Sequence, residues 1–185
     1  MELLCPAGNK ESLIAAINSG ADAIYLSGKK FGARAFATNF SNEELKEAIR
    51  IGKIYGVKIY VTMNTLIKEN EIDEFLSQVE FLYSNGVDAI LMQDFGMICL
   101  CLKKYPNLEI HASTQAHNSS LQGIDFLYKL GVKRVVLPRE MSLDEIKLIK
   151  TPIEKEVFIH GALCVSYSGR CLISQVLGGR SGNRG

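Results

Sequence analysis

The sequence predicts an α/β fold, a parallel (β/α) barrel of the TIM type that is incomplete, with about seven β/α units. Three observations predict it. A glycine-led apolar phrase recurs along the chain, each copy follows an amphipathic stretch, and the apolar runs number about seven. We interpret residues 1–185 as a single domain, because the chain is long enough for one sizeable core but short for two.

The recurring phrase occurs at four places. GADAIYLS begins at Gly20, GVKIYVTMN at Gly56, GVDAILMQD at Gly86 and GVKRVVLPRE at Gly131. The glycine suits the position after a helix, where a left-handed backbone costs little without a Cβ atom. The continuous apolar run after it is typical of a strand that is covered on both faces.

The stretches before these glycines have helical periodicity. In EIDEFLSQVEFLYSN, the apolar side chains from Ile72 to Leu82 fall on one face of a helix. A unit of helix, glycine and buried strand therefore repeats. Such a repeat implies parallel strands joined by right-handed crossovers.

Three further apolar runs complete the set: ELLCPA near the start, LEIHASTQ from Leu108 and EVFIHGAL from Glu156. Open doubly wound sheets usually have five or six strands and a TIM barrel has eight, so about seven favours a barrel without its last unit. A complete barrel needs at least ~200 residues. The closing GGRSGNRG has no apolar residue. We therefore expect the C-terminal remainder of a longer protein to be absent.

The composition is that of an ordinary globular protein, with 47% hydrophobic and 22% charged residues. A net charge of +1 gives no reason to expect a broad nucleic-acid surface. No apolar run approaches the ~18 residues of a membrane span, and the N-terminus lacks the features of a signal peptide. We expect a cytoplasmic protein without membrane contact, whose five cysteines are reduced thiols or ligands.

Polar residues gather where the predicted strands end. Asn64, Asp94 and Arg139 each stand eight positions after the repeat glycine, and Gln115 takes that place in the strand from Leu108. The carboxyl edge of a parallel barrel carries the active site in known enzymes of this fold. The predicted substrate-binding residues are Asn64, Gln115, Arg139 and Glu140, and the predicted catalytic residues are Asp94 and His160.

Each of these polar residues also has an ordinary structural explanation, since strand ends turn polar as the chain leaves the core. Arg139 is the best candidate for holding an anion, because its planar fork matches a carboxylate or phosphate. An ion pair with Glu140 or Asp94 is the alternative for Arg139. In EIHASTQ, the two-residue period sends His111 and Gln115 into the barrel.

Cys164 and Cys171 lie in a loop rich in glycine and serine after the seventh strand, at the predicted functional edge. Cys5, Cys99 and Cys101 lie within predicted strands or helices, where a thiol packs as a small hydrophobic group. The spacing Cys-x6-Cys is not that of a zinc knuckle, so by itself it is a weak metal signal.

The residues around these two cysteines are familiar. EVFIHGALCVSYSGRCLIS, residues 156–174, closely resembles the signature of the collagenase-like peptidase family, U32. ELLCPAGN, YLSGKKFGARAFATNF, IHASTQAHNS, VVLPREMS and GGRSGNRG fit the same family. The resemblance spans the whole chain but only the N-terminal part of a family protein. It departs at Cys5, where the family usually has alanine.

The resemblance implies a function. The better-understood members resemble oxygen-independent hydroxylases that modify a tRNA or rRNA base or a quinone precursor and hold a [4Fe–4S] cluster on four cysteines. By that likeness Cys164 and Cys171 match two ligands, and the other two lie beyond Gly185. We expect RNA-base hydroxylation by the full-length protein. The 185-residue chain alone should lack the cluster.

Two other functions stay open. A peptidase, for which the family is named, would need Cys164 activated by His160, or a metal held by His111, His117 and His160. A non-catalytic subunit would bind a partner chain, or a second copy, at the open barrel edge.

RNA as a partner rests on the resemblance, and a small-molecule substrate is the alternative. A modest basic rim is conceivable from Lys29, Lys30, Arg170, Arg180 and Arg184. Scattered solvated charges are the ordinary explanation of the same residues.

Overall fold

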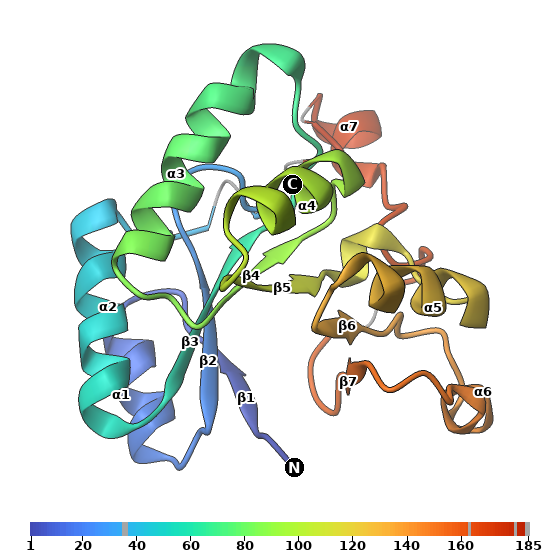
Figure 1. The fold of residues 1–185 in the computed structure, drawn as a ribbon, viewed down its shortest axis with the longest axis horizontal. Helices are drawn as coiled ribbons and strands as arrows, with labels where there is room; N and C mark the ends of the chain where they lie inside the picture. The colour runs from blue at the N-terminus through green and yellow to red at the C-terminus, as the bar shows by residue number, and fades with distance from the viewer. Residues whose placement is uncertain (35–36, 163, 180, 184–185) are drawn as a thin grey trace.

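The computed structural model describes residues 1–34, 37–162, 164–179 and 181–183 (Figure 1). Within them lies one parallel sheet whose seven strands neighbour each other in chain order. The strands are β1 (Leu4–Pro6), β2 (Ala23–Ser27), β3 (Lys58–Met63), β4 (Ala89–Met92), β5 (Glu109–Ala112), β6 (Arg134–Val136) and β7 (Glu154–Glu156). The predicted fold class, an incomplete parallel barrel, is confirmed.

Helices alternate with the strands and cover the outside of the curled sheet (Figure 1). They are α1 (Lys10–Asn18), α2 (Asn42–Tyr55), α3 (Ile72–Ser84), α4 (Phe95–Lys104), α5 (Leu121–Leu130), α6 (Leu143–Leu148) and α7 (Ile173–Gly178), with 3₁₀ turns at η1 (Glu69–Glu71) and η2 (Thr114–Ala116). Within the described ranges, none of these helices is long and apolar enough to cross a membrane.

The glycines of the repeat have the predicted left-handed backbone. The φ angles are +86° at Gly20, +70° at Gly56, +74° at Gly86 and +103° at Gly131. Gly56 and Gly131 are the C-cap residues of α2 and α5, respectively. The same local chemistry therefore ends each helix and turns the chain into the next strand.

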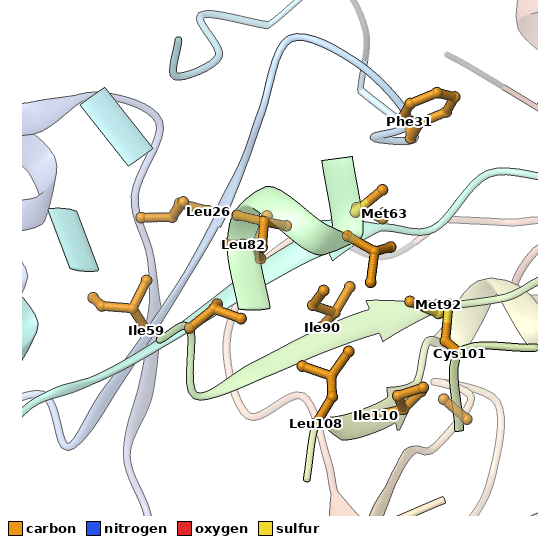
Figure 2. Close-up of a cluster of buried hydrophobic side chains, with 14 of the residues drawn as sticks. Leu26, Phe31, Ile59, Met63, Leu82, Ile90, Met92, Cys101, Leu108 and Ile110 are labelled. Carbon is orange, nitrogen blue, oxygen red and sulfur yellow. The ribbon is translucent and has the colours of Figure 1, made fainter. Parts of the chain in front are cut away.

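Alternate residues of the strands pack on opposite sides of the sheet. The outward set, which includes Ile59, Ile90 and Ile110, packs against the helices in the main core (Figure 2). The inward set is smaller and fills the barrel with Ala23, Tyr60, Ala89, Leu91 and Val136. This alternation is the two-residue period of a strand that is covered on both faces.

His111 lies inside the barrel, as the pattern of β5 predicted. Its ring is fully buried and meets the ring of Tyr60 edge to face, with centroids 4.8 Å apart. Ile110 and Ala112, its neighbours along the strand, belong to the outer core.

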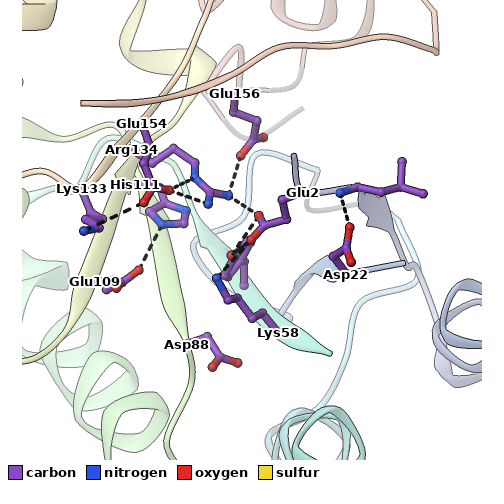
Figure 3. Close-up of polar contacts among 12 residues, drawn as sticks. Glu2, Asp22, Lys58, Asp88, Glu109, His111, Lys133, Arg134, Glu154 and Glu156 are labelled. Atoms are coloured by element: carbon purple, nitrogen blue, oxygen red, sulfur yellow. Dashed lines mark hydrogen bonds and ion pairs between the residues drawn. The ribbon is translucent and has the colours of Figure 1, made fainter. Parts of the chain in front are cut away.

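Charged side chains form a floor across the amino ends of the strands (Figure 3). Arg134 Nη1 donates to Glu2 Oε1 at 2.6 Å, and Arg134 Nε and Nη2 donate to Glu154 Oε2 at 3.0 and 2.7 Å. The Tyr60 hydroxyl donates to the same Glu2 carboxylate, and Lys58 Nζ lies 3.2 Å from it. Glu2 precedes β1, whereas Arg134 begins β6, so the sheet curls far enough for its two sides to meet at the floor.

The last strand differs from the prediction. It was expected to start at Glu156 and continue through His160, but β7 covers Glu154–Glu156. Val157 is 46% exposed and Ile159 is 83% exposed, so the apolar run after Glu156 is not a buried strand. Among the described strands its neighbour is β6, which ends at Val136. The next donor on that side after Leu137 is the Arg139 N–H, which donates to Ser168 Oγ instead of to the segment after Glu156.

Candidate active site

A cavity of about 510 Å³ opens at the carboxyl ends of the strands. Its walls come from β1, β2, β3, β4, β6 and β7, from the residues just after β5, and from the segment that follows β7. Both apolar and polar groups line it, and its size is typical of a small-molecule site. This is the edge at which the polar residues were predicted to converge.

The cavity brings together most of the predicted site residues. Asn64, Gln115, Arg139, Cys164 and Cys171 all line it. Asp94, Glu140 and His160 are not among its lining residues. The five lining residues are therefore placed to contact a ligand directly. The positions of Asp94, Glu140 and His160 need another explanation.

Asn64 connects three loops at the cavity wall. Its Nδ2 donates to Ser113 Oγ at 3.1 Å, and its Oδ1 accepts the backbone N–H of Ala33 at 3.0 Å. Its backbone carbonyl accepts a hydrogen bond from Gln93 Nε2 at 2.8 Å. The position of Asn64 is thus well defined by its partners.

Asp94 has a structural position. Oδ1 accepts the N–H of Met97 at 3.1 Å as the N-cap of α4, and Oδ2 accepts the N–H of Ile67 at 3.1 Å. Both oxygens satisfy backbone donors, which ties the loop after β3 to the start of α4.

Glu140 holds the segment that follows β7. Its Oε1 accepts the backbone N–H of Ser168 at 3.1 Å, and its Oε2 accepts the Ser168 hydroxyl at 2.9 Å. Burial alone would raise the pKa of Glu140, but the hydrogen bonds of its own backbone N–H and of Ser168 lower it below the ordinary value. His117 lies 3.6 Å from the same carboxylate and contacts the Ser168 carbonyl at 2.8 Å through Nδ1.

Gly169 fits this position because it lacks a side chain. Its φ is +75°, and a Cβ atom there would lie 2.4 Å from the carbonyl oxygen of Gln115. The segment after β7 therefore presses directly on η2, which follows β5. This close contact explains why a glycine stands at position 169, between Cys164 and Cys171.

Asn183 anchors the far end of the same segment. Its Oδ1 accepts the N–H of Leu66 at 2.8 Å and the Nε2–H of Gln93 at 3.0 Å, and its Nδ2 donates to the Leu66 carbonyl at 3.0 Å. In Figure 1 the segment runs from β7 to α7 on the side where the strands end. Cys171 lies between the two anchors, Ser168 and Asn183.

Arg139 presents an unpaired charge to the cavity. Its guanidinium lies over the Phe158 ring, with Cζ 3.9 Å from the centroid, and its backbone N–H donates to Ser168 Oγ at 3.3 Å. Across the described residues it forms no ion pair with Glu140 or Asp94. The ring holds the guanidinium in place without neutralising it.

The two cysteines are free thiols at the cavity, Cys164 exposed and Cys171 half-buried. No group of three or more metal-ligating side chains occurs within the described ranges. Two thiols at one cavity fit two of the four ligands that a [4Fe–4S] cluster needs. Cys101 is buried in α4, as predicted for a packing role, and burial raises its pKa to about 12.

The histidines are distributed over different environments. His160 is exposed and lies outside the cavity lining. Burial lowers the pKa of His111 to about 3, so it stays neutral at the floor. His117 is engaged with Ser168. Within the part of the chain that the structure describes, none of the three forms a hydrogen bond with Cys164.

Sequence reasoning missed Glu156 as a site residue. Glu156 lines the cavity although its side chain is only 15% exposed, and it ends β7 on the inward face. One pattern in the sequence could have identified it. Glu156 stands two positions after Glu154, on the same face of the strand, where an apolar run begins.

Comparisons with known proteins agree with the signature. The family model described as peptidase family U32 matches residues 8–185. Over its full length the chain is 41% identical to the tRNA hydroxylation protein P1 of Bacillus subtilis and 43% identical to the 23S rRNA 5-hydroxycytidine C2501 synthase of Escherichia coli. It is 34% identical to a collagenase of Porphyromonas gingivalis.

The chain spans 44%, 28% and 47%, respectively, of the length of these three relatives. Among solved structures, the U32 peptidase Mk0906 superposes with a TM-score of 0.71 over 85% of this chain and 67% of that one, at 14% identity. At that identity the likeness concerns the fold. On the family model, the chain belongs to peptidase family U32.

Proposed function

We propose that this chain is the N-terminal barrel of a cytoplasmic protein that hydroxylates a base of tRNA or rRNA. The observation that carries the proposal is the meeting of Cys164 and Cys171 with Asn64, Gln115 and Arg139 at one cavity. Relatives that are named for tRNA hydroxylation and for rRNA 5-hydroxycytidine synthesis support this chemistry.

The proposed cofactor is a [4Fe–4S] cluster, with Cys164 and Cys171 as two of its ligands and two further cysteines from the rest of the full-length protein. Such a cluster supplies electron transfer. This chain's own residues would hold the substrate in the cavity: Asn64 is fixed by its hydrogen bonds to Ser113 and Ala33, and Arg139 would offer its charge to a phosphate.

The proposed RNA contacts beyond the cavity are few. Lys29 and Arg170 are exposed, and Lys30 is paired with Glu74. Arg180 and Arg184 lie outside the described residues. Most of the RNA contacts should come from the remainder of the full-length protein. The open edge of the sheet would be covered by that remainder or by a second copy of the protein.

Peptidase activity has less support from the geometry. A thiol protease needs a base beside the thiol, and no histidine of the described residues forms a hydrogen bond with Cys164. The name of the collagenase relative is the argument in its favour.

The test uses the full-length protein, purified without air. We expect visible absorption with bound iron and sulfide, and restored hydroxylation of RNA, read by mass spectrometry of nucleosides, in cells that lack the gene. Cys164→Ser and Cys171→Ser should each abolish both readouts. Cys99→Ser, a half-buried thiol on α4, is the matched control and should keep both.

A colourless wild-type protein that leaves RNA unchanged contradicts the proposal. Cleavage of a fluorogenic gelatin substrate that is lost in Cys164→Ser would instead establish the peptidase.

A further inference from the structure

The chain after β7 places its aromatic and its aliphatic side chains differently. Among the described residues from 157 to 178, Phe158 and Tyr167 are exposed and line the cavity. The exposed aliphatic side chains of the same stretch lie outside the cavity lining: Val157, Ile159, Val165, Leu172, Ile173, Val176 and Leu177. An aromatic ring offers a flat π face that an aliphatic side chain lacks. The cavity is therefore equipped for a ligand with a flat ring.

The Phe158 ring already has a partner. The Arg139 guanidinium lies over it, with Cζ 3.9 Å from the ring centroid, which is contact distance. Phe158 thus holds a cation against one of its faces. Its role in the cavity is to place the charge of Arg139.

Tyr167 has an aromatic face to spare. Its side chain is 67% exposed, and its ring contact is with His117, at a centroid distance of 5.9 Å and an interplanar angle of 86°. A perpendicular contact of this kind covers at most one face of the tyrosine ring. Tyr25 also lines the cavity, but it packs against the inward core cluster. Tyr167 is therefore the tyrosine whose ring is open to a ligand.

The support of Tyr167 is rigid. Its carbonyl accepts the N–H of Arg170 at 3.0 Å, and the next residue, Ser168, is buried and held by Glu140. His117 has a φ of +52°, a left-handed backbone that side chains rarely adopt, and its Nδ1 lies 2.8 Å from the Ser168 carbonyl oxygen. Such strain is kept where the surrounding structure needs one geometry, often at a ligand site. A ring held in advance loses little entropy when a ligand binds.

A cation lies near this ring. The backbone N–H of Arg139 donates to Ser168 Oγ at 3.3 Å, and Ser168 follows Tyr167 directly in the chain. The open ring and the unpaired guanidinium thus belong to one part of the cavity wall. Proteins that bind unpaired RNA combine these two features: bases stack on aromatic side chains, and positive charges contact the phosphates.

We propose that Tyr167 contacts the substrate, with an unpaired nucleobase of RNA stacked on its ring and a phosphate of the same strand at Arg139. The inference rests on the proposed function and deepens it, because it names the residue that receives a base. Every base has a π face, so this contact positions a base without selecting one base over another.

The experiment compares the affinities of the full-length protein for two probes, measured by calorimetry. One is an oligouridylate, and the other is a chain of equal length whose riboses carry no base. The phosphates are the same in both, so the difference in affinity reports the bases. The wild-type protein should bind the oligouridylate at least about tenfold more tightly than the abasic chain.

Three variants separate stacking from structure. Tyr167→Leu removes the ring but keeps an apolar side chain, so it should weaken oligouridylate binding about tenfold and leave binding of the abasic chain unchanged. Tyr167→Phe keeps the ring and should bind both probes as the wild type does. Tyr55→Leu is the matched control, because Tyr55 ends α2, is 61% exposed and does not line the cavity.

A wild-type protein that does not distinguish the two probes overturns the inference. A Tyr167→Leu variant that binds oligouridylate as the wild type does also overturns it. Equal weakening of both probes in Tyr167→Leu does the same, since it would reflect a change of structure and not a lost stack.

Hydroxylation of RNA is measured separately. Base-dependent binding that Tyr167→Leu removes, in a protein that hydroxylates no RNA, supports this inference and contradicts the proposed function. Hydroxylation by a protein whose oligouridylate binding is unchanged in Tyr167→Leu does the reverse.

Discussion

The two ends of the barrel use polar side chains in different ways. At the amino ends of the strands, Arg134, Glu2, Glu154 and Tyr60 bond to one another and close the floor. At the carboxyl ends, Asp94 and Glu140 bond to backbone groups and hold loops, while Arg139 and the two thiols remain free for a ligand. Polar side chains thus stabilise the fold at the amino ends of the strands, whereas at the carboxyl ends some of them remain able to bind a ligand.

Removing the central cation of the floor should have the largest effect on stability. Arg134→Met leaves the Glu2 and Glu154 carboxylates without their main partner, and such a loss costs about 3–5 kcal/mol. The free energy of unfolding in urea measures it. Arg50→Met breaks an exposed pair with Glu47 and should cost less than about 1 kcal/mol. Equal effects of the two variants would mean that the floor is no more important than a surface pair.

At the rim, Gly169→Ala should lower the free energy of unfolding by about 2–4 kcal/mol, since it combines a left-handed backbone with a close contact. The added Cβ would lie 2.4 Å from the Gln115 carbonyl. Gly56→Ala is the matched control, because Gly56 has a φ of +70° but open space around it. It should lower the free energy of unfolding by about 1–2 kcal/mol. If the two variants cost the same, the segment after β7 does not press on η2.

Acid should weaken the floor. Burial would raise the pKa of Glu2, but its bonds from Arg134, Lys58 and Tyr60 lower it to about 2 from 4.5. A carboxylate with a depressed pKa contributes stability that is present above pH 4.5 and is lost as the pH falls toward 2. Glu2 is partly exposed, so the loss should be about 2 kcal/mol or less.

Urea unfolding between pH 2 and pH 6 measures this loss, and Glu2→Gln should flatten the acid slope. A slope that is unchanged in Glu2→Gln would assign the acid sensitivity to other carboxylates.

The sequence predicted what local patterns determine. The repeat glycines, the inward position of His111 and the gathering of Asn64, Gln115 and Arg139 follow from short-range periodicity that the structure keeps. The family signature identified Cys164 and Cys171 as residues of the functional edge, and both line the cavity.

Residues whose position depends on distant partners could not be predicted. An acidic residue at a strand end is the same signal whether it binds a ligand or holds a backbone N–H, so the bonds of Asp94 to Met97 and of Glu140 to Ser168 could not be predicted. The length of β7 depends on its neighbour β6, which local apolarity does not report. The bond between Arg134 and Glu2 joins residues 132 positions apart.

That separation has a consequence for synthesis on the ribosome. Glu2 is made 132 positions before Arg134, so until Arg134 emerges the Glu2 carboxylate has, among the described residues, only Lys58 and Tyr60 as partners. Until then, the nascent chain carries a half-built sheet whose inner face is open to water, a state prone to aggregation. Slow translation or a chaperone at this stage should raise the yield of folded protein more than any change made after release.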